Sequence, residues 1–297
     1  MHTRHSVRWI SSVAALAAGV IGLGVPLAAP AAAAAGETIT VTAEQPRYQV
    51  STTGYVDAVL TGAPAAPAPT VTVTSGPDAP PAAGAVVNAP CTLVTTNNYR
   101  CPILNGGTTG NDTVVVSDAA VAPTSNSAAV NLGFETIAAV PLQNFGTLAA
   151  PIGLYGTGEL ATISVQVTGN GGVAGAANIK GTIAPGGPDA PGAAAAPITC
   201  TNAAGTGNFT CTFTNNGTTG ADQVTIFDDD TANGTPGVRD PNEPQVAAFP
   251  VNFEKVTATP TTSAPNTTSF AVNVTGNIAA HAPAIKEVVV SGTDSAA

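Results

Sequence analysis

Short stretches of alternating hydrophobic and polar residues recur along most of this chain. The alternation has a period of two residues and uses many β-branched side chains, which is typical of strands with one buried face. Clear examples are the stretches 38–42, 70–74, 113–116, 161–167, 224–227 and 270–274. Gly, Pro and Asn bound these stretches, and no segment combines a helical hydrophobic period with capping residues. The pattern predicts an all-β chain of antiparallel strands.

Long parts of the sequence repeat, which indicates tandem modules. The segment Cys101–Asp112 recurs without a gap as Cys211–Asp222. Upstream of it, Gly76–Pro80 reappears as Gly187–Pro191. Each repeated unit therefore carries the same turns between the same strands.

The junctions between the modules repeat as well, because residues 128–141 align without gaps with residues 247–260. We predict one module over 36–133, a second over 134–252 and a partial third over 253–297. Roughly 100 residues of short strands per module fits a two-sheet sandwich. A single β-solenoid is the alternative, but the repeat is much longer than a usual rung. No Ser- or Gly-rich spacer separates the modules, which favours short joints.

The first 35 residues have the three parts of a secretory signal peptide. Two arginines precede an apolar stretch over 13–27, and Ala31–Ala35 supply the small residues of a cleavage site. We expect residues 1–35 to be removed on export, because Pro26 and Pro30 disfavour the alternative of an uncleaved membrane anchor. No later segment is long and apolar enough to predict a membrane span. The expected product is secreted or associated with the cell surface.

The composition excludes some classes of function. Only 9% of the residues are charged, and the formal net charge is −10 at pH 7. This balance argues against a nucleic-acid partner, because phosphate contacts need clustered Lys and Arg. After residue 35 the chain has one histidine, His281, so the base that a serine or cysteine nucleophile requires is scarce. We predict a protein that is not an enzyme and has no catalytic residues.

The four cysteines predict two disulfides. Four cysteines in an exported chain allow three connectivities. The repeat selects Cys91–Cys101 and Cys200–Cys211, one bridge in each module, each between neighbouring strands of a hairpin. A metal site is the alternative, but the spacings are too long for a typical ligand pair and no histidine lies nearby.

The second module resembles the bacterial immunoglobulin-like domains of the invasin and intimin type. The resemblance rests on Cys-x10-Cys-Thr-Phe-Thr-Asn-Asn-Gly-Thr-Thr-Gly-x-Asp-x-Val-x-Ile and on the acidic loop that follows. The first module departs from this pattern after Asp118. The resemblance implies tandem immunoglobulin-like antiparallel β-sandwiches, with an incomplete third module, that form an exported stalk or adhesive protein. Its partner would be a surface or extracellular protein or glycan of unknown identity.

The acidic loop is the best candidate for a binding site. It contains Asp228, Asp229, Asp230, Asn233, Asp240 and Glu243. Since Ca²⁺ takes six to eight oxygen ligands from such loops, a structural calcium site is one interpretation. The spacing is one residue longer than an EF-hand start, and the first module lacks the loop. The alternative is therefore a solvated turn with like charges, and no other cofactor is predicted.

Two further interpretations concern partners. Residues 253–297 are too few to bury a sandwich core alone, so they are mobile, pack on the second module, or offer a strand edge for self-association. Another function class is a secreted small-molecule carrier similar to the enediyne apoproteins, which are also small sandwiches with two disulfides. A carrier needs an apolar cleft, to which Tyr48, Tyr55, Phe209 and Phe213 would contribute.

Overall fold

The computed structural model describes residues 38–62, 68–82, 84–118, 125–169, 178–202, 207–229, 237–264 and 267–276. All regular secondary structure within these ranges is β-strand, which confirms the all-β prediction. The predicted signal peptide, Asp230, Asn233 and His281 lie outside the described residues.

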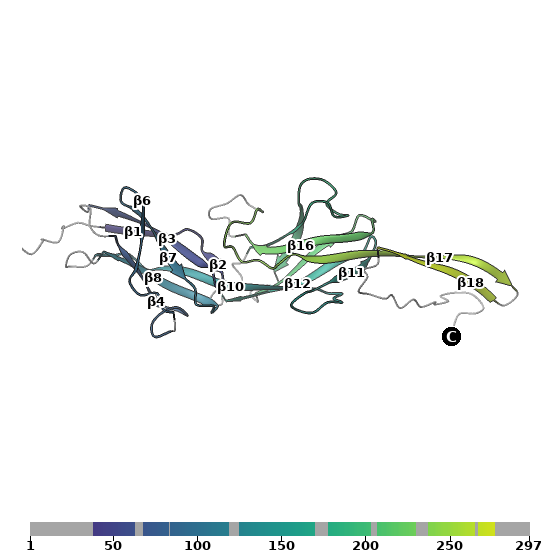
Figure 1. Cartoon of the computed structure of the whole chain (residues 1–297), viewed down its shortest axis with the longest axis horizontal. Helices are drawn as coiled ribbons and strands as arrows, with labels where there is room; N and C mark the ends of the chain where they lie inside the picture. The colour runs from purple at the N-terminus through teal and green to yellow at the C-terminus, as the bar shows by residue number, and fades with distance from the viewer. Residues whose placement is uncertain are drawn as a thin grey trace, which may run out of the picture. The chain divides into compact units, whose positions relative to one another are not determined.

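The first sandwich consists of two sheets (Figure 1). One sheet has the antiparallel order β1-β3-β7-β6, formed by Thr38–Ala43, Thr53–Thr61, Asn98–Leu104 and Thr92–Thr95. The other has the order β2-β10-β8-β4-β5, formed by Arg47–Gln49, Val130–Pro141, Gly110–Asp118, Thr70–Ser75 and Ala89–Pro90. The short β9, Ser125–Asn126, pairs with β8. Within the second sheet only the pairing of β2 with β10 is parallel.

The second sandwich repeats this topology. Its first sheet has the order β10-β12-β15-β14, in which the new strands are Leu160–Gly169, Asn208–Thr214 and Ala196–Asn202. Its second sheet has the order β11-β17-β16-β13-β14, with Gly153–Gly156, Phe249–Ala264, Gly220–Asp228 and Ile179–Ile183. Strand β14 contributes to both sheets, because its start pairs with β13 and its end with β15. The two modules are thus immunoglobulin-like sandwiches.

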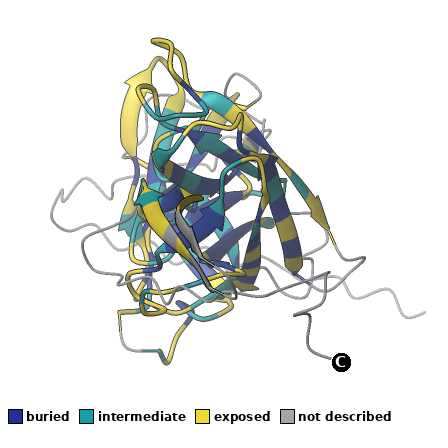
Figure 2. Ribbon diagram, turned by 90° about the vertical axis from the view of Figure 1, so that its right-hand side faces the viewer, coloured by how far each residue is buried: buried dark blue, intermediate teal, exposed yellow. Residues whose placement is uncertain are grey.

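Each sandwich has a hydrophobic core of its own. Side chains alternate between buried and exposed positions along the strands, as a pleated backbone requires (Figure 2). Tyr48 and Phe134 are fully buried in the first core, with ring centroids 5.8 Å apart. Phe213 and Phe253 pack edge to face in the second core, also at 5.8 Å. The alternation read from the sequence therefore identifies the buried face of these strands.

Each sandwich contains one disulfide. Cys91 lies between β5 and β6 and is bonded to Cys101 in β7. Cys200 in β14 is bonded to Cys211, its direct partner in β15. The pairing is the one predicted from the repeat, and all four cysteines are oxidised.

Strand β17 continues beyond the second sandwich into a hairpin. Lys255–Ala264 pairs antiparallel with β18, Thr267–Thr275. The antiparallel pairing of β17 with β18 resembles that of β10 with β12. That this hairpin opens a third module stays a prediction. The remaining part of the predicted third module, residues 277–297, lies outside the described residues.

Candidate functional site

The joint between the sandwiches is built on one continuous strand. Residues Val130–Phe134 of β10 pair with β8 of the first sandwich. Residues Glu135–Pro141 of the same strand pair with β12 of the second. Because the strand passes from one sheet ladder to the next without a loop, the joint contains no spacer residues.

A buried ion pair crosses this joint. Arg47 in β2 is 8% exposed, and Asp228 at the end of β16 is fully buried. Arg47 donates a hydrogen bond of 3.3 Å from a terminal guanidinium nitrogen to Asp228 Oδ1, and its Nε contacts Oδ2. The same Oδ1 accepts a hydrogen bond of 2.6 Å from the Asn178 backbone N–H. The Asp228 carboxylate is therefore held by groups from both sandwiches.

The chain between β16 and β17 makes further contacts with the first sandwich. The backbone N–H of Gln49 donates to the Asn242 carbonyl at 2.9 Å. The Gln45 side-chain amide donates to the Pro241 carbonyl at 3.1 Å. These two hydrogen bonds and the ion pair link residues almost 200 positions apart in sequence, so the connection is purely tertiary.

Carboxylates of the acidic loop also accept hydrogen bonds from backbone N–H groups of the same loop. Asp229 Oδ2 accepts a hydrogen bond of 2.7 Å from the Gly237 N–H. Glu243 Oε2 accepts one of 2.7 Å from the Asp240 N–H, and the Glu243 carbonyl accepts another of 3.1 Å from Arg239. Asp229 and Glu243 are buried. These contacts tie together the described parts of the loop, Asp229 and residues 237–243.

The six candidate calcium ligands are only partly described. Asp228, Asp229 and Glu243 are buried and engaged with protein groups, so the alternative of a solvated acidic turn does not fit these three. Asp230 and Asn233 lie outside the described residues. Within the described ranges, no three His, Cys, Asp or Glu side chains come together as a metal-binding group.

A second polar network occurs once in each sandwich and uses the repeated motifs. In the first sandwich, Asp112 Oδ1 accepts a hydrogen bond of 3.1 Å from the Asp78 N–H. The Asp78 carboxylate in turn accepts hydrogen bonds of 2.8 Å from Asn105 Nδ2 and the Gly106 N–H. Asn105 Oδ1 accepts from the backbone of Ser51 at 2.9 Å. The network therefore joins four separate segments of the chain.

The second sandwich builds the same network from the corresponding residues. Asp222 Oδ1 accepts from the Asp189 N–H at 3.1 Å, and the Asp189 carboxylate accepts from Asn215 Nδ2 at 3.0 Å. The Asn216 N–H donates to Asp189 at 2.7 Å. The repeated Gly-Pro-Asp-Ala-Pro and Asn-x-Gly-Thr-Thr-Gly-x-Asp segments are thus two halves of one structural unit.

Glycine is required where these halves meet. A Cβ on Gly76 would lie 2.4 Å from Asp112 Oδ1, and one on Gly187 would lie 2.3 Å from Asp222 Oδ1. No side chain fits at such distances from a buried carboxylate. The first Gly of the motif therefore permits the close approach that the hydrogen bonds need.

The buried carboxyls have unusual acid–base properties. Burial is the main cause that raises the pKa of Asp112 to about 7; the Asp78 N–H opposes this effect and the Asp78 carboxyl adds to it. Burial likewise raises the pKa of Asp222 to about 7, with the Asp189 carboxyl as the next cause. In both carboxyls with a raised pKa, Oδ2 accepts no hydrogen bond from the described protein groups. Each therefore carries a proton at mildly acidic pH.

The aromatic side chains considered for a carrier cleft have other surroundings. Tyr48, Phe209 and Phe213 are buried members of the two cores. The Arg100 guanidinium lies over the Tyr55 ring, with its Cζ 5.5 Å from the ring centroid. Tyr48, Phe209 and Phe213 therefore pack the two cores. Tyr55 lines a pocket together with polar residues such as Glu44, Arg100 and Asp240, and not with the other three aromatic side chains.

The described residues contain no helix that is long and apolar enough to cross a membrane.

Sequence reasoning missed the role of Arg47 at the joint. Arg47 could have been singled out as one of few basic residues in an acidic chain. Its partner could not, because their pairing depends on the joint.

No protein-family model matches the chain, and no curated protein matches its sequence. Among solved structures it is similar to a marsupial T cell receptor, with 10% identity and a TM-score of 0.37 over 76% of this chain and 78% of that one. It is also similar to FdeC, an Escherichia coli adhesin, with 16% identity and a TM-score of 0.25 over 82% and 74% of the two chains. The Yersinia pseudotuberculosis adhesin InvE gives 14% identity and a TM-score of 0.23 over 73% and 58%. These values assign the chain to no family and no function.

Proposed function

We propose that this chain is an exported, non-enzymatic structural or adhesive protein whose sandwiches form a spacer with a fixed joint. It would act at the cell surface or in the surrounding medium and present its loops and strand edges to a surface or extracellular protein or glycan. The single observation that carries the proposal is the joint, in which one strand and one buried ion pair connect the sandwiches.

The physical argument concerns the cost of bending. Rotation at the joint would have to break ladder hydrogen bonds of β10 or separate Arg47 from Asp228. Separation leaves a buried carboxylate without its cation, which typically costs about 3–5 kcal/mol. A chain whose modules search independently for ligands gains nothing from such a lock, whereas a spacer needs it.

The chemical inventory supports a non-enzymatic role. All four cysteines are bonded in disulfides, so the chain has no free thiol. Oδ1 of Asp112 and of Asp222 accepts a hydrogen bond within a turn, and the Asp228 carboxylate is paired with Arg47 at the joint. Two disulfides also suit an oxidising compartment outside the cytosol.

The proposal is tested by measuring whether the sandwiches tumble together. Residual dipolar couplings would be recorded by NMR on the chain without residues 1–35, and each sandwich would be fitted separately. One common alignment tensor is expected for the wild type, and two different tensors for Arg47→Ala. Lys180→Ala also removes one positive charge, but from β13 and not from the ion pair. It is the control and should leave one tensor. Two independent tensors in the wild type would refute the proposal.

A further inference from the structure

A pocket with charged walls lies at the joint between the sandwiches. Its volume is about 460 Å³. Its lining comprises Glu44, Gln45, Tyr55 and Arg100 from the first sandwich and residues 240–242 from the chain between β16 and β17. The Gln45 side chain donates a hydrogen bond across the joint to this chain. A pocket of this size between two domains is a typical place for a ligand.

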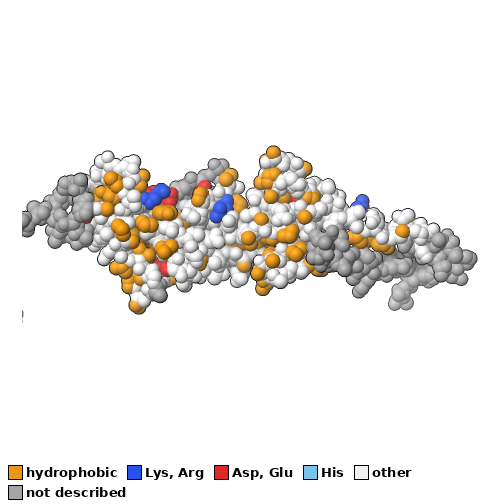
Figure 3. Space-filling view, viewed as in Figure 1, with side chains coloured by type: hydrophobic (Ala, Val, Ile, Leu, Met, Phe, Trp, Pro, Cys, Tyr) orange, Lys and Arg blue, Asp and Glu red, His pale blue; other side chains and the backbone are white. Residues whose placement is uncertain are grey.

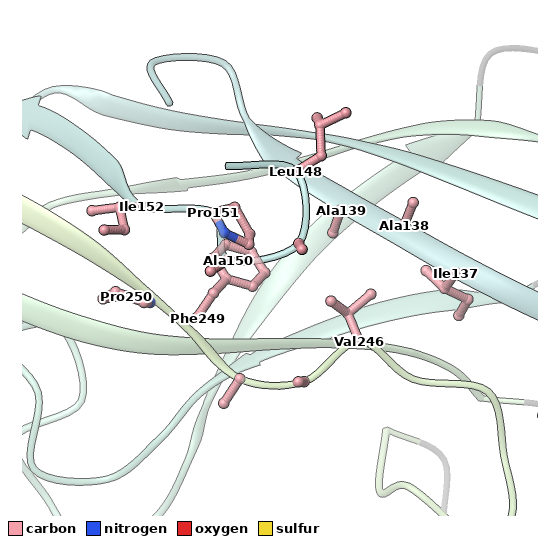
Figure 4. A pocket seen from close by; sticks show the side chains of 13 residues that line it. Ile137, Ala138, Ala139, Leu148, Ala150, Pro151, Ile152, Val246, Phe249 and Pro250 are labelled. Atoms are coloured by element: carbon pink, nitrogen blue, oxygen red, sulfur yellow. The ribbon is translucent and has the colours of Figure 1, made fainter. Parts of the chain in front are cut away.

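The chemistry of this pocket differs from that of the rest of the surface. Charged side chains are sparse on the face of the molecule that Figure 3 shows. The groove in Figure 4, beside β10 and β17, is lined by apolar side chains alone. In the joint pocket three of the seven lining residues are charged, although only 9% of the chain is charged. The joint pocket therefore suits a charged ligand better than an apolar one.

The charges of the pocket indicate the sign of this ligand. Arg100 is the basic residue of the lining, and its charge is already balanced. Its guanidinium lies 2.9 Å from Glu44 Oε1 and donates a hydrogen bond of 3.1 Å from Nε to Asp57 Oδ1. Together with Asp240, three carboxylates accompany one guanidinium, which leaves an excess of negative charge. Charge complementarity therefore favours a cationic ligand.

The lining also has hydrogen-bond acceptors to spare. Within the described ranges the Asp240 carboxylate accepts no hydrogen bond, although the Asp240 backbone donates to Glu243. Gln45 is only 5% exposed, and its Oε1 has no hydrogen-bond partner there. A buried amide oxygen that accepts no hydrogen bond is costly, so a donor that reaches it is favoured. Glu44 uses Oε1 for Arg100, which leaves Oε2 available.

A primary ammonium group matches these acceptors. It carries one positive charge and three donors and has no acceptor, whereas a guanidinium is a planar fork that suits a single carboxylate. A calcium ion takes six to eight oxygen ligands, and here it would lie beside the Arg100 guanidinium. No three His, Cys, Asp or Glu side chains of the described residues come together to supply such a ligand set. An ammonium ligand therefore fits better than a metal ion.

We propose that the joint pocket binds a primary ammonium group, with Asp240, Glu44 and Gln45 as its acceptors. A lysine side chain of a partner protein and a free alkylamine both carry this group, and lysine presents it on a flexible four-carbon stem. The pocket exists only where the joint brings residues 44–45 and 240–242 together. The inference therefore rests on the fixed joint of the proposed spacer, to which it adds a ligand site.

The test is an NMR titration of the chain without residues 1–35 with Nα-acetyl-lysine amide at neutral pH. Saturable shifts are expected at the amides of Glu44, Gln45, Asp240 and Asn242. Asp240→Asn should raise the dissociation constant at least about tenfold, because a charge-assisted hydrogen bond is replaced by a weaker neutral one. Glu159→Gln, which removes the same charge at an exposed position outside the pocket, is the matched control and should leave the constant unchanged. Unchanged spectra elsewhere check that both variants are folded.

Further probes identify the source of the ammonium group. Nα-acetyl-norleucine amide has no ammonium and should not bind. Butylamine that binds as tightly as the lysine derivative assigns the pocket to a free alkylamine, and weaker binding assigns it to a lysine side chain. The proposal is overturned if no amine gives saturable shifts, or if calcium chloride shifts these amides and the amines do not. In a chain that binds no ammonium, one alignment tensor would overturn only the pocket, and two tensors would refute the spacer as well.

Discussion

Stability should decrease as the pH rises from about 4 to 7, because of Asp112 and Asp222. Each buried carboxyl has a pKa of about 7 in the folded chain. In the unfolded chain the value is about 3.9. Below pH 4 both states hold the proton, and above pH 7 neither does. Between these values only the folded state is protonated, so stability is greatest at the acidic end and is lost as the pH passes through 7.

The size of this pH effect follows from the difference in pKa between the folded and the unfolded chain. Within this window each carboxyl changes the free energy of unfolding by up to about 1.4 kcal/mol per pH unit. Over the full shift, from 3.8 to about 7, the upper limit is about 4 kcal/mol for each carboxyl. Urea unfolding followed by NMR at several pH values gives the free energy for each sandwich separately. Fluorescence is less suitable, because the only tryptophan, Trp9, lies in the predicted signal peptide.

The internal repeat supplies a matched control. Asp112→Asn keeps an oxygen that accepts the Asp78 N–H but cannot ionise, so it should flatten the pH profile of the first sandwich only. Asp222→Asn should flatten that of the second only. If the amide destabilises the fold by the same amount at every pH, it shifts the plot of unfolding free energy against pH without changing its slope. Wild-type and variant profiles that run parallel between pH 4 and 7 would show that these carboxyls are not protonated, and would refute the reasoning.

Three further predictions concern stability. Arg47→Met should destabilise the chain by about 3–5 kcal/mol in calorimetry. Adding Asp228→Leu should recover most of this loss, since an apolar pair has no buried charge to satisfy. Equal losses in the single and double variants would contradict the ion pair. Cys211→Ser should destabilise the second sandwich by about 3 kcal/mol in urea, because a short closed loop is released in the unfolded state; an unchanged midpoint would argue against the bridge. Gly187→Ala should lower the free energy of unfolding by several kcal/mol, because the added Cβ collides with the Asp222 carboxylate. Gly192→Ala is the control and should cost under about 0.5 kcal/mol, since a Cβ there meets nothing within 4 Å. Similar losses in the two variants would be inconsistent with the tight turn.

The features that could be predicted from the sequence depend on local pattern or on repetition. The alternation in 161–167 predicts a strand with one buried face, because side chains alternate strictly along an extended backbone. The repeat selects the disulfide Cys200–Cys211 over other connectivities, and the two residues are direct partners in adjacent strands. Both features are encoded over a few residues or copied along the chain.

The acidic loop shows where such reasoning ends. From its composition it is a candidate calcium ligand set or a solvated turn. In the structure, the Asp228 carboxylate pairs with Arg47 of the other sandwich. Nothing near Asp228 in the sequence indicates this cation, because the two residues are 181 positions apart. Carboxylate oxygens are equally suited to calcium, water or a guanidinium, so residue type alone cannot select among them.

By itself, then, the sequence determined the strands, the modular repeat and the disulfide pairs. These follow from short-range backbone geometry and from the internal copies. Only the tertiary structure decided that β10 serves both sandwiches, that Asp228 is neutralised by Arg47, and that Glu44 and Asp240 line one pocket. The physical reason is that burial and the choice of partner depend on which distant segments meet. That meeting is fixed by the packing of whole sheets and not by any local pattern.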